Sequence, residues 1–235
     1  MQVSKLSKPL NGDILRFLQL ILLALLPSSA KVFLLKQLGH QIGKNVRIGF
    51  SFLDVNNLTL GDNVNINSWN YFKNIQQLEM KKNSRIGGRC NWFTCSENNK
   101  ETVGSGHIII GEGSNITSKH YFDVQEIIHI GNNTMIAGSN SVFYTHTVTP
   151  TKKKVNKPVV IGSNCYIGSH CLLVPGAIIG DSSFVAAGSV VSRDFSKQNF
   201  VLLAGNPAQI KKHYDKNSSF FISEHNGFKP SKSSN

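Results

Sequence analysis

Histidine is the side chain best suited to proton transfer in this sequence, because its imidazole titrates near neutral pH. The chain has eight histidines, and His146 stands out because it lies in YTHTV, shortly before KPVVIG. At this place the imidazole could act as a general base that takes a proton from a hydroxyl group. The remaining histidines, apart from two discussed next, are typical of surface, turn or scaffold positions: His40, His107, His170, His213 and His225.

A second polar segment, SKHYFD, precedes His146 and carries His120 and Asp123. An aspartate near a catalytic histidine could orient the imidazole or bind the hydroxyl of an acceptor, and it could equally serve only in a turn. We therefore place His120 and Asp123 among the candidate substrate-binding residues. The role of His129 stays open.

The elements that must position these side chains follow from a repeat. Aliphatic residues recur at every sixth position in the C-terminal half, and the residue two positions earlier is small from Cys165 onward. A period of six fits neither a helix nor a simple strand, and it marks a solenoid whose units bury their apolar faces by stacking. The aliphatic series is Ile161, Ile167, Leu173, Ile179, Val185 and Val191, and its phase returns earlier at Leu60, Ile66, Phe72, Leu78, Met80, Ile86, Ile110, Ile116, Phe122, Ile128, Ile130, Ile136 and Val142.

Three units of six residues form one triangular coil, and successive coils pair at about 4.8 Å. The distance from Met80 to Ile110 is thirty residues, and that from Ile130 to Ile161 is thirty-one. Loops must therefore leave the solenoid near residues 95–106 and 145–157. Long loops on a rigid scaffold are where function is expected, and the second loop has His146 at its mouth.

The run IGSNCYIGSHCLLVPGAIIGDSSFVAAGSVVSRD, followed by AGNPAQ, resembles the C-terminal half of hexapeptide-repeat O-acetyltransferases, which include galactoside, maltose and polysaccharide acetyltransferases. The resemblance implies an all-β solenoid, a left-handed parallel β-helix of about seven coils, although the general crossover rule favours the right hand. It also implies transfer of an acetyl or similar acyl group from acyl-coenzyme A to a hydroxyl. In this family His146 occupies the position of the catalytic histidine.

The same resemblance implies a binding site for acetyl-CoA. Ser169 and Ala187 are eighteen residues apart, one full coil, and are expected to line the pantetheine arm. Ser192 and Arg193 replace the usual Thr-Lys pair of the family near the nucleotide phosphates, and Lys211 could add a positive charge. The family further implies a homotrimer with active sites between subunits, and a sugar hydroxyl of a polysaccharide or cell-envelope pathway as acceptor.

We expect no metal in this protein. The four cysteines form no CxxC pair, so neither a zinc ribbon nor a disulfide framework is indicated. A carbonic-anhydrase branch of the same scaffold binds zinc through histidines, two of which are five residues apart. Here the residue five after His146 is Thr151.

The chain divides into three parts by composition. Residues 1–39 contain apolar stretches over 14–26 and up to Leu38, each too short for the roughly 20 apolar residues of a spanning helix. They are expected either to cap the first coil or to lie on a membrane surface. Residues 40–197 form the repeat domain, and 198–235 form an extension with a GNPA turn and a polar tail. We expect a cytoplasmic location, either free or at the inner face of the membrane.

The formal charge of +12 is spread over short lysine groups, such as 152–154, and no long basic helix joins them. This distribution argues against a nucleic-acid partner, whereas a phosphate-bearing cofactor or an anionic lipid surface would suit it. Two alternatives to the O-acyltransferase remain. One is a non-catalytic β-helix scaffold or binding protein, and the other is an N-acyltransferase for an amino sugar.

Overall fold

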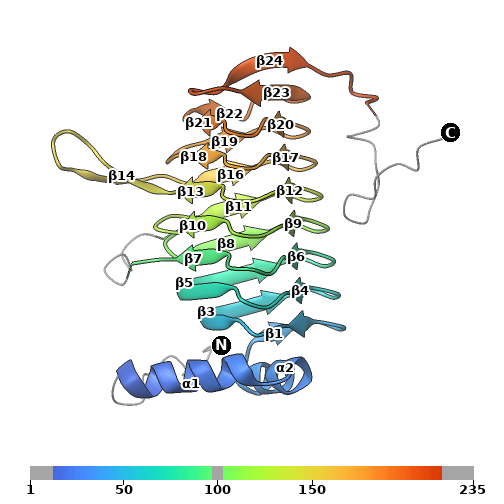
Figure 1. Ribbon diagram of the computed structural model, residues 1–235, viewed down its shortest axis with the longest axis vertical. Coiled ribbons are helices and arrows are strands. Elements are labelled where there is room, and N and C mark those ends of the chain that lie inside the picture. The colour runs from blue at the N-terminus through green and yellow to red at the C-terminus, as the bar shows by residue number, and fades with distance from the viewer. Residues whose placement is uncertain (1–12, 97–102, 219–235) are drawn as a thin grey trace.

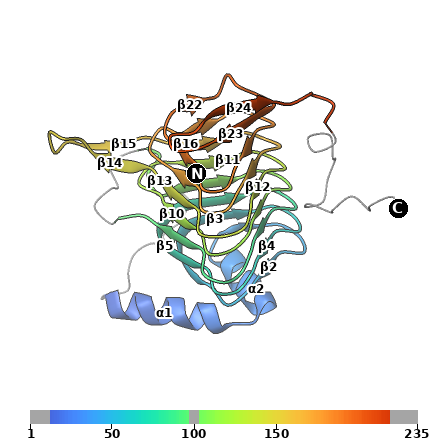
Figure 2. The ribbon, with the colours of Figure 1, turned by 45° about the horizontal axis from the view of Figure 1, so that its top comes forward.

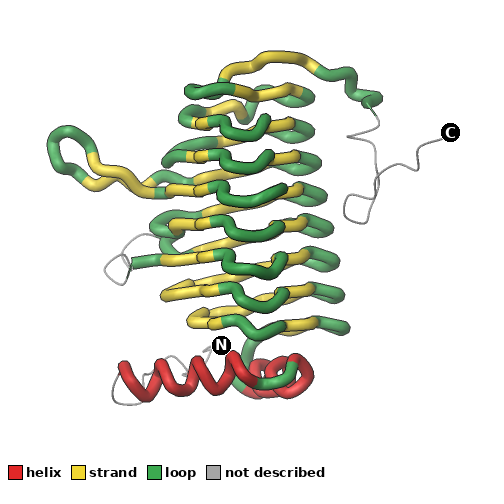
Figure 3. The backbone as a smooth tube through the Cα atoms, in the orientation of Figure 1, coloured by secondary structure: helices red, strands yellow, loops and turns green. Residues whose placement is uncertain are grey.

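The chain winds into a three-sided parallel β-helix with two helices lying across its first coil (Figure 1). The computed structural model describes residues 13–96 and 103–218. The coils are left-handed, as the repeat of the family implies. Strands lie on the flat sides and tight turns form the corners, and Figure 3 shows the two alternating along the coils.

The strands fall on three faces, which we number in chain order within a coil. The first face carries β2 (Arg47–Ile48), β4 (Asn65–Ile66), β6 (Arg85–Ile86), β9 (Asn115–Ile116), β12 (Met135–Ile136), β17 (Tyr166–Ile167), β20 (Phe184–Val185), β23 (Val201–Ala204) and, antiparallel, β24 (Gln209–His213). The second face carries β7 (Trp92–Thr94), β10 (Tyr121–Asp123), β13 (Val142–Tyr144), β18 (Leu172–Leu173) and β21 (Val190–Val191).

The third face carries β1 (Gln41–Ile42), β8 (His107–Ile110), β11 (Ile128–Ile130), β16 (Val159–Ile161), β19 (Ile178–Ile179) and β22 (Asp194–Phe195). Two long strands, β3 (Phe52–Leu60) and β5 (Tyr71–Met80), run over the second and third faces together. A separate antiparallel hairpin, β14 (His146–Val148) with β15 (Lys154–Asn156), leaves the solenoid after β13.

The core consists of columns of inward side chains, each stacked on its counterpart in the next coil. On the first face the column is aliphatic and fully buried from Ile48 to Ile167. On the second face it becomes aromatic: Phe72, Phe93, Phe122 and Phe143 stack with ring centroids 4.4 to 4.5 Å apart. These columns confirm the solenoid that the period of six predicts. Along the first face the parallel strands reach eight levels.

One position of the predicted series is wrong. The period of six places Val142 inward, but Phe143 is fully buried and pairs with Phe122, while Val142 pairs with Tyr121 and is partly exposed. The corner between β12 and β13 holds one extra residue, and Gly138 and Asn140 both take positive φ angles there. This left-handed backbone is accessible to glycine and asparagine, so the corner absorbs the residue without disturbing the stack.

Both ends of the described solenoid are covered. α1 (Asp13–Leu25) packs on β3, and α2 (Ser28–Gln37) packs on β1 and β2. At the other end, β23 pairs parallel with β20 and then turns back into β24. The parallel pairing therefore continues past residue 197, where composition divides the chain; that division into parts stays a prediction.

The inward position of Phe143 is testable by truncation. Phe143→Ala removes a ring from the aromatic stack and should lower the free energy of unfolding by about 3–5 kcal/mol. Val142→Ala, the matched control on the outer side, should lower it by less than about 1 kcal/mol. Denaturant unfolding followed by circular dichroism measures both. If Val142→Ala were the more damaging change, the inward phase of this coil would be the one that strict periodicity predicts.

Candidate active site

The hairpin holds His146 where the chain leaves the solenoid. It projects from the side of the coils (Figures 1 and 2). His146 is the first residue of β14 and pairs with Asn156, which is the last residue of β15. The hairpin is anchored at its base because the Lys157 N–H donates to the carbonyl of Thr145 at 2.9 Å. The imidazole is therefore fixed by the coil on one side and by the hairpin on the other.

Asp123 is the residue that orients the imidazole. Its Oδ2 lies 2.5 Å from His146 Nδ1, although the two residues are 23 positions apart in the chain. β10 and β13 pair in register, Asp123 opposite Tyr144, so consecutive coils bring the carboxylate to the point where the hairpin begins. The Asp123 side chain is 4% exposed and that of His146 is 38% exposed. A buried acceptor thus faces a partly exposed ring.

This geometry defines the protonation of the ring. With the carboxylate accepting from Nδ1–H, the neutral imidazole has its lone pair on Nε2, which is the form that can accept a proton from a substrate. Within the described residues Nε2 makes no protein hydrogen bond. The pair is therefore built as a base whose proton-accepting nitrogen remains available.

Thr145 hydrogen-bonds to Asp123 and so fixes its carboxylate. The sequence did not point to this role of Thr145. Its N–H donates to Asp123 Oδ2 at 3.3 Å, and its hydroxyl donates to the Asp123 carbonyl at 2.7 Å. The Thr145 hydroxyl in turn accepts from the Glu126 N–H at 2.9 Å. The residue is fully buried. Its proximity to His146 in sequence was the only available signal, because its partners lie one coil away.

Tyr144 contributes an aromatic wall to the site. Its ring stands perpendicular to the His146 imidazole with centroids 6.4 Å apart, and it also makes an edge contact with Tyr121 at 6.1 Å. Tyr121 is held in turn by a hydrogen bond of 3.0 Å between its hydroxyl and Thr94 Oγ1. The predicted site therefore has an aromatic side as well as the ionic one.

The structure does not bring His120 to the His146–Asp123 pair, and its substrate-binding role stays a prediction. Its ring is buried in a corner, where Nδ1 accepts from the Ser141 N–H and Nε2 lies 3.0 Å from Thr117 Oγ1. Burial lowers the pKa of His120 to about 4, so the ring is neutral at physiological pH. Both ring nitrogens have a protein partner, Thr117 in the same coil and Ser141 in the next coil.

The predicted coenzyme A residues lie near the C-terminal end of the solenoid, at different places around it. Ser169 and Ala187 occupy adjacent coils at the corner between the first and second faces, joined by the Gly188 N–H, which donates to the Ser169 carbonyl at 2.9 Å. Ser192 and Arg193 are exposed at the next corner, just after β21, and Lys211 is exposed on β24. One chain therefore does not bring the Ser169–Ala187 pair onto the same corner as His146.

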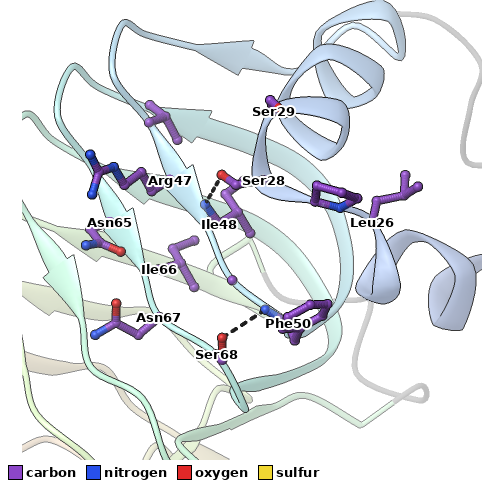
Figure 4. A pocket seen from close by; sticks show the side chains of 13 residues that line it. Leu26, Ser28, Ser29, Arg47, Ile48, Phe50, Asn65, Ile66, Asn67 and Ser68 are labelled. Carbon is purple, nitrogen blue, oxygen red and sulfur yellow. Dashed lines mark hydrogen bonds between the residues drawn. The ribbon is translucent and has the colours of Figure 1, made fainter.

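A cavity of about 690 Å³ lies elsewhere, at the opposite end of the molecule (Figure 4). It is lined by the start of α2 and by the first face of the first two coils. None of the residues predicted for catalysis or cofactor binding contributes to it. In the described parts of the chain, no group of three or more His, Cys, Asp or Glu residues is arranged to hold a metal ion.

Comparison with known proteins decides the type of repeat. Residues 158–193 match the family model of the bacterial transferase hexapeptide, described as six repeats. This segment of the chain therefore carries hexapeptide repeats. This segment contains β16 to β21 and includes Ser169, Ala187 and Arg193.

Curated proteins that match parts of this chain carry acetyltransferase names. The chain is 34% identical over 88 residues to the galactoside O-acetyltransferase of Escherichia coli K12, which is 35% of this chain and 42% of the relative. A putative acetyltransferase of Saccharomyces cerevisiae is 47% identical over 53 residues, covering 23% and 26%. The matches thus span less than half the length of these curated relatives. A solved maltose O-acetyltransferase of Clostridium difficile 630 covers 88% of this chain and 91% of its own at 21% identity, with a TM-score of 0.47.

The orienting role of Asp123 can be tested by a change of one atom. Asp123→Asn keeps the size but offers an amide that can donate to Nδ1, which would place the proton on Nε2 and abolish the base. Turnover of an acetyl-CoA-dependent reaction should fall at least about 100-fold with little change in KM. Asp62→Asn is the control, because Asp62 also accepts a backbone N–H in a corner, from Lys44 at 2.6 Å. Equal turnover in both variants would exclude an orienting role for Asp123.

Proposed function

We propose that this protein transfers an acetyl group, or a similar small acyl group, from acyl-coenzyme A to a hydroxyl of a sugar in polysaccharide or cell-envelope biosynthesis. The observation that carries the proposal is the His146–Asp123 pair, in which Nε2 has no hydrogen-bond partner among residues 13–96 and 103–218. The hexapeptide match over 158–193 and the acetyltransferase names of the relatives support it.

In this reaction, the His146–Asp123 pair moves one proton from the acceptor hydroxyl to the departing sulfur. Nε2 of His146 takes the proton of the acceptor hydroxyl as its oxygen attacks the thioester carbonyl carbon. The carbon–sulfur bond then breaks, and the same nitrogen returns the proton to the departing sulfur, giving the ester and free coenzyme A thiol. Asp123 stabilises the imidazolium that forms between the two steps without accepting the proton itself.

In this proposal, acyl-coenzyme A binds along Ser169, Ala187, Ser192, Arg193 and Lys211. Ala187 and Gly188 offer little side-chain volume at their corner, and no atom lies within 4 Å of a Cβ built at Gly188. The Arg193 guanidinium is exposed and offers a charge-assisted contact to a phosphate. Acyl-coenzyme A is the co-substrate, which supplies the activated thioester.

We further propose that a homotrimer completes the site. The hairpin projects from its own solenoid, and its residue Val148 is 61% exposed. A neighbouring subunit placed under the hairpin would bring its own Ser169 and Ala187 toward His146, which one chain alone keeps at another corner. The same arrangement argues against a non-catalytic scaffold, because a scaffold has no need for an oriented base.

Replacement of His146 tests the proposed chemistry. His146→Ala should lower acyl transfer by about 100-fold or more, while coenzyme A binding and the thermal transition stay near wild type. Release of free thiol from acetyl-CoA, measured across hydroxyl and amine sugars, gives both the rate and the acceptor class. His170→Ala is the control, since its ring is exposed and, among the described residues, hydrogen-bonds to Asn140 alone. Acetylation of amines alone would favour the amino-sugar alternative, and undiminished turnover would reject His146.

The cofactor residues can be separated by charge and volume. Arg193→Ala should weaken coenzyme A binding by about 1 kcal/mol and flatten its salt dependence, because an exposed phosphate contact is lost. Ala187→Phe should block coenzyme A and pantetheine alike. Titration calorimetry measures both ligands. If Arg193→Ala weakened pantetheine, which lacks the nucleotide phosphates, as much as coenzyme A, Arg193 would not contact phosphate.

A further inference from the structure

The outer sides of the two helices form an apolar surface at the base of the solenoid. We call it the basal patch and define it by Phe17, Leu18, Ile21, Leu22 and Leu25 of α1 together with Phe33 of α2. All six are exposed, Leu22 and Phe33 at 66% each. Figures 1 and 2 show α1 lying across this end of the molecule, on the side away from the C-terminal coils.

The patch is one face of α1, a point that the sequence alone does not reveal. Apolar residues occur all around this helix, but the partly buried ones, Leu20, Leu23 and Ala24, lie on the side toward the coil. Leu23 packs against the core, and Arg16 on the same side pairs with Asp54 of β3. The exposed residues therefore do not contribute to the packing of the helix against the coil. An exposed apolar area of this kind marks a surface that binds a partner.

The patch is held rigidly against the first coil. Lys31 of α2 is completely buried, and its ammonium donates to the Ala24 carbonyl of α1 at 3.1 Å and to the Gly49 carbonyl at 2.5 Å. Burial lowers the pKa of Lys31. The Ser28 hydroxyl accepts from the Ile48 N–H at 2.9 Å, as Figure 4 shows. Both helices thus keep a fixed orientation on the solenoid.

The charges around the patch identify its partner. Of the three basic residues in the two helices, Lys31 is buried, Arg16 pairs with Asp54 while its side chain is 42% exposed, and Lys36 is exposed. Asp13, the first residue of α1, is the one acidic residue of the two helices. Arg47 is the one charged residue that lines the adjoining cavity (Figure 4). A second copy docking through the same face would bring like charges together, whereas anionic headgroups complement them.

We propose that the basal patch docks this protein on an anionic phospholipid surface, with both helices lying in the plane of the interface. Apolar side chains with cations at their rim are the composition of interfacial helices. The described residues contain no helix with both the length and the hydropathy needed to cross a bilayer. The solenoid would then stand upright on the membrane.

Docking by the base leaves the active site clear of the lipid. β13 lies four strands above β3 on the second face. At about 4.8 Å for each coil, with a helix layer about 10 Å thick beneath, the His146–Asp123 pair stands roughly 30 Å above the membrane. Changes in the patch should therefore not alter turnover of a soluble acceptor.

Vesicle sedimentation of the full chain tests this inference. Wild type should pellet with phosphatidylglycerol-containing vesicles and bind at least tenfold less to phosphatidylcholine vesicles, and added salt should release it. The double variant Leu22→Asp, Phe33→Asp should lose binding at least tenfold while keeping its thermal transition. Val103→Asp is the matched control, because Val103 is 95% exposed and lies outside the patch.

Three results would overturn the proposal. Wild type could stay in the supernatant with anionic vesicles at low salt, or the double variant could pellet as wild type does. Light scattering could instead show that the double variant breaks up an oligomer while wild type ignores vesicles, in which case the patch covers a second copy. If the aspartate variant fails to fold, Leu22→Ser with Phe33→Ser replaces it, and binding undiminished by the serines would count equally against the proposal.

Discussion

The stacking of one coil on the next is the constraint on which every other feature of this molecule depends. A strand of two or three residues has too few hydrogen bonds and too little apolar surface to be stable alone, so each coil must match its neighbour residue for residue. Ile48, Ile66 and Ile86 show the result on the first face, where register and burial coincide. Additional residues can be accommodated only at corners, and long additions must leave the body there. The position of His146 follows from this rule.

The corners require as much matching as the flat sides, because they bury polar backbone groups. At the corner between the first and second faces the same position is filled by Asn70, Asn91, His120, Ser141 and Cys171 in successive coils. The members are linked: Asn91 Nδ2 donates to Asn70 Oδ1 at 3.0 Å, and the N–H of His120 donates to Asn91 Oδ1 at 3.0 Å. His120 then accepts from the Ser141 N–H. A buried polar ladder of this kind is stable because every member finds a partner.

The ladder shows which positions of the fold can be predicted from the sequence. The period of six correctly predicts the inward columns, and the residue two positions before each aliphatic residue is the corner position. His120 stands two before Phe122, so the pattern itself assigns it to the ladder. The chemistry of a histidine side chain does not by itself reveal this corner position. Val142 failed for the opposite reason: Val142 and Phe143 are both apolar, so composition cannot show which of them points inward when a corner gains a residue.

The sequence offers an orienting role for Asp123 only as one of several alternatives and cannot choose among them, since the position of Asp123 against the next coil depends on a local offset. Asp123 comes opposite Tyr144 only because the corner before β13 holds its extra residue. A strict period of six would instead pair Phe122 with Val142 and Asp123 with Phe143, one position along, where side chains point to the other face of the strand. A single inserted residue at Gly138–Asn140 is thus what aligns a buried carboxylate with the base of the hairpin.

The matching of coils also explains why the His146–Asp123 pair lies where the hairpin interrupts the regular solenoid. Inside the stack, the polar groups described above are satisfied by a neighbouring coil, as His120 is, and a satisfied imidazole with a lowered pKa cannot serve as a base. His146 differs because it lies at the base of the hairpin, where the chain leaves the coil, so that Asp123 holds one nitrogen while the other has no partner in the described part of the chain. A β-helix can offer such a half-satisfied residue only where a loop departs. The loop that creates the free nitrogen also leaves the ring exposed on one side, which is the physical reason to expect a second subunit to complete the wall around it.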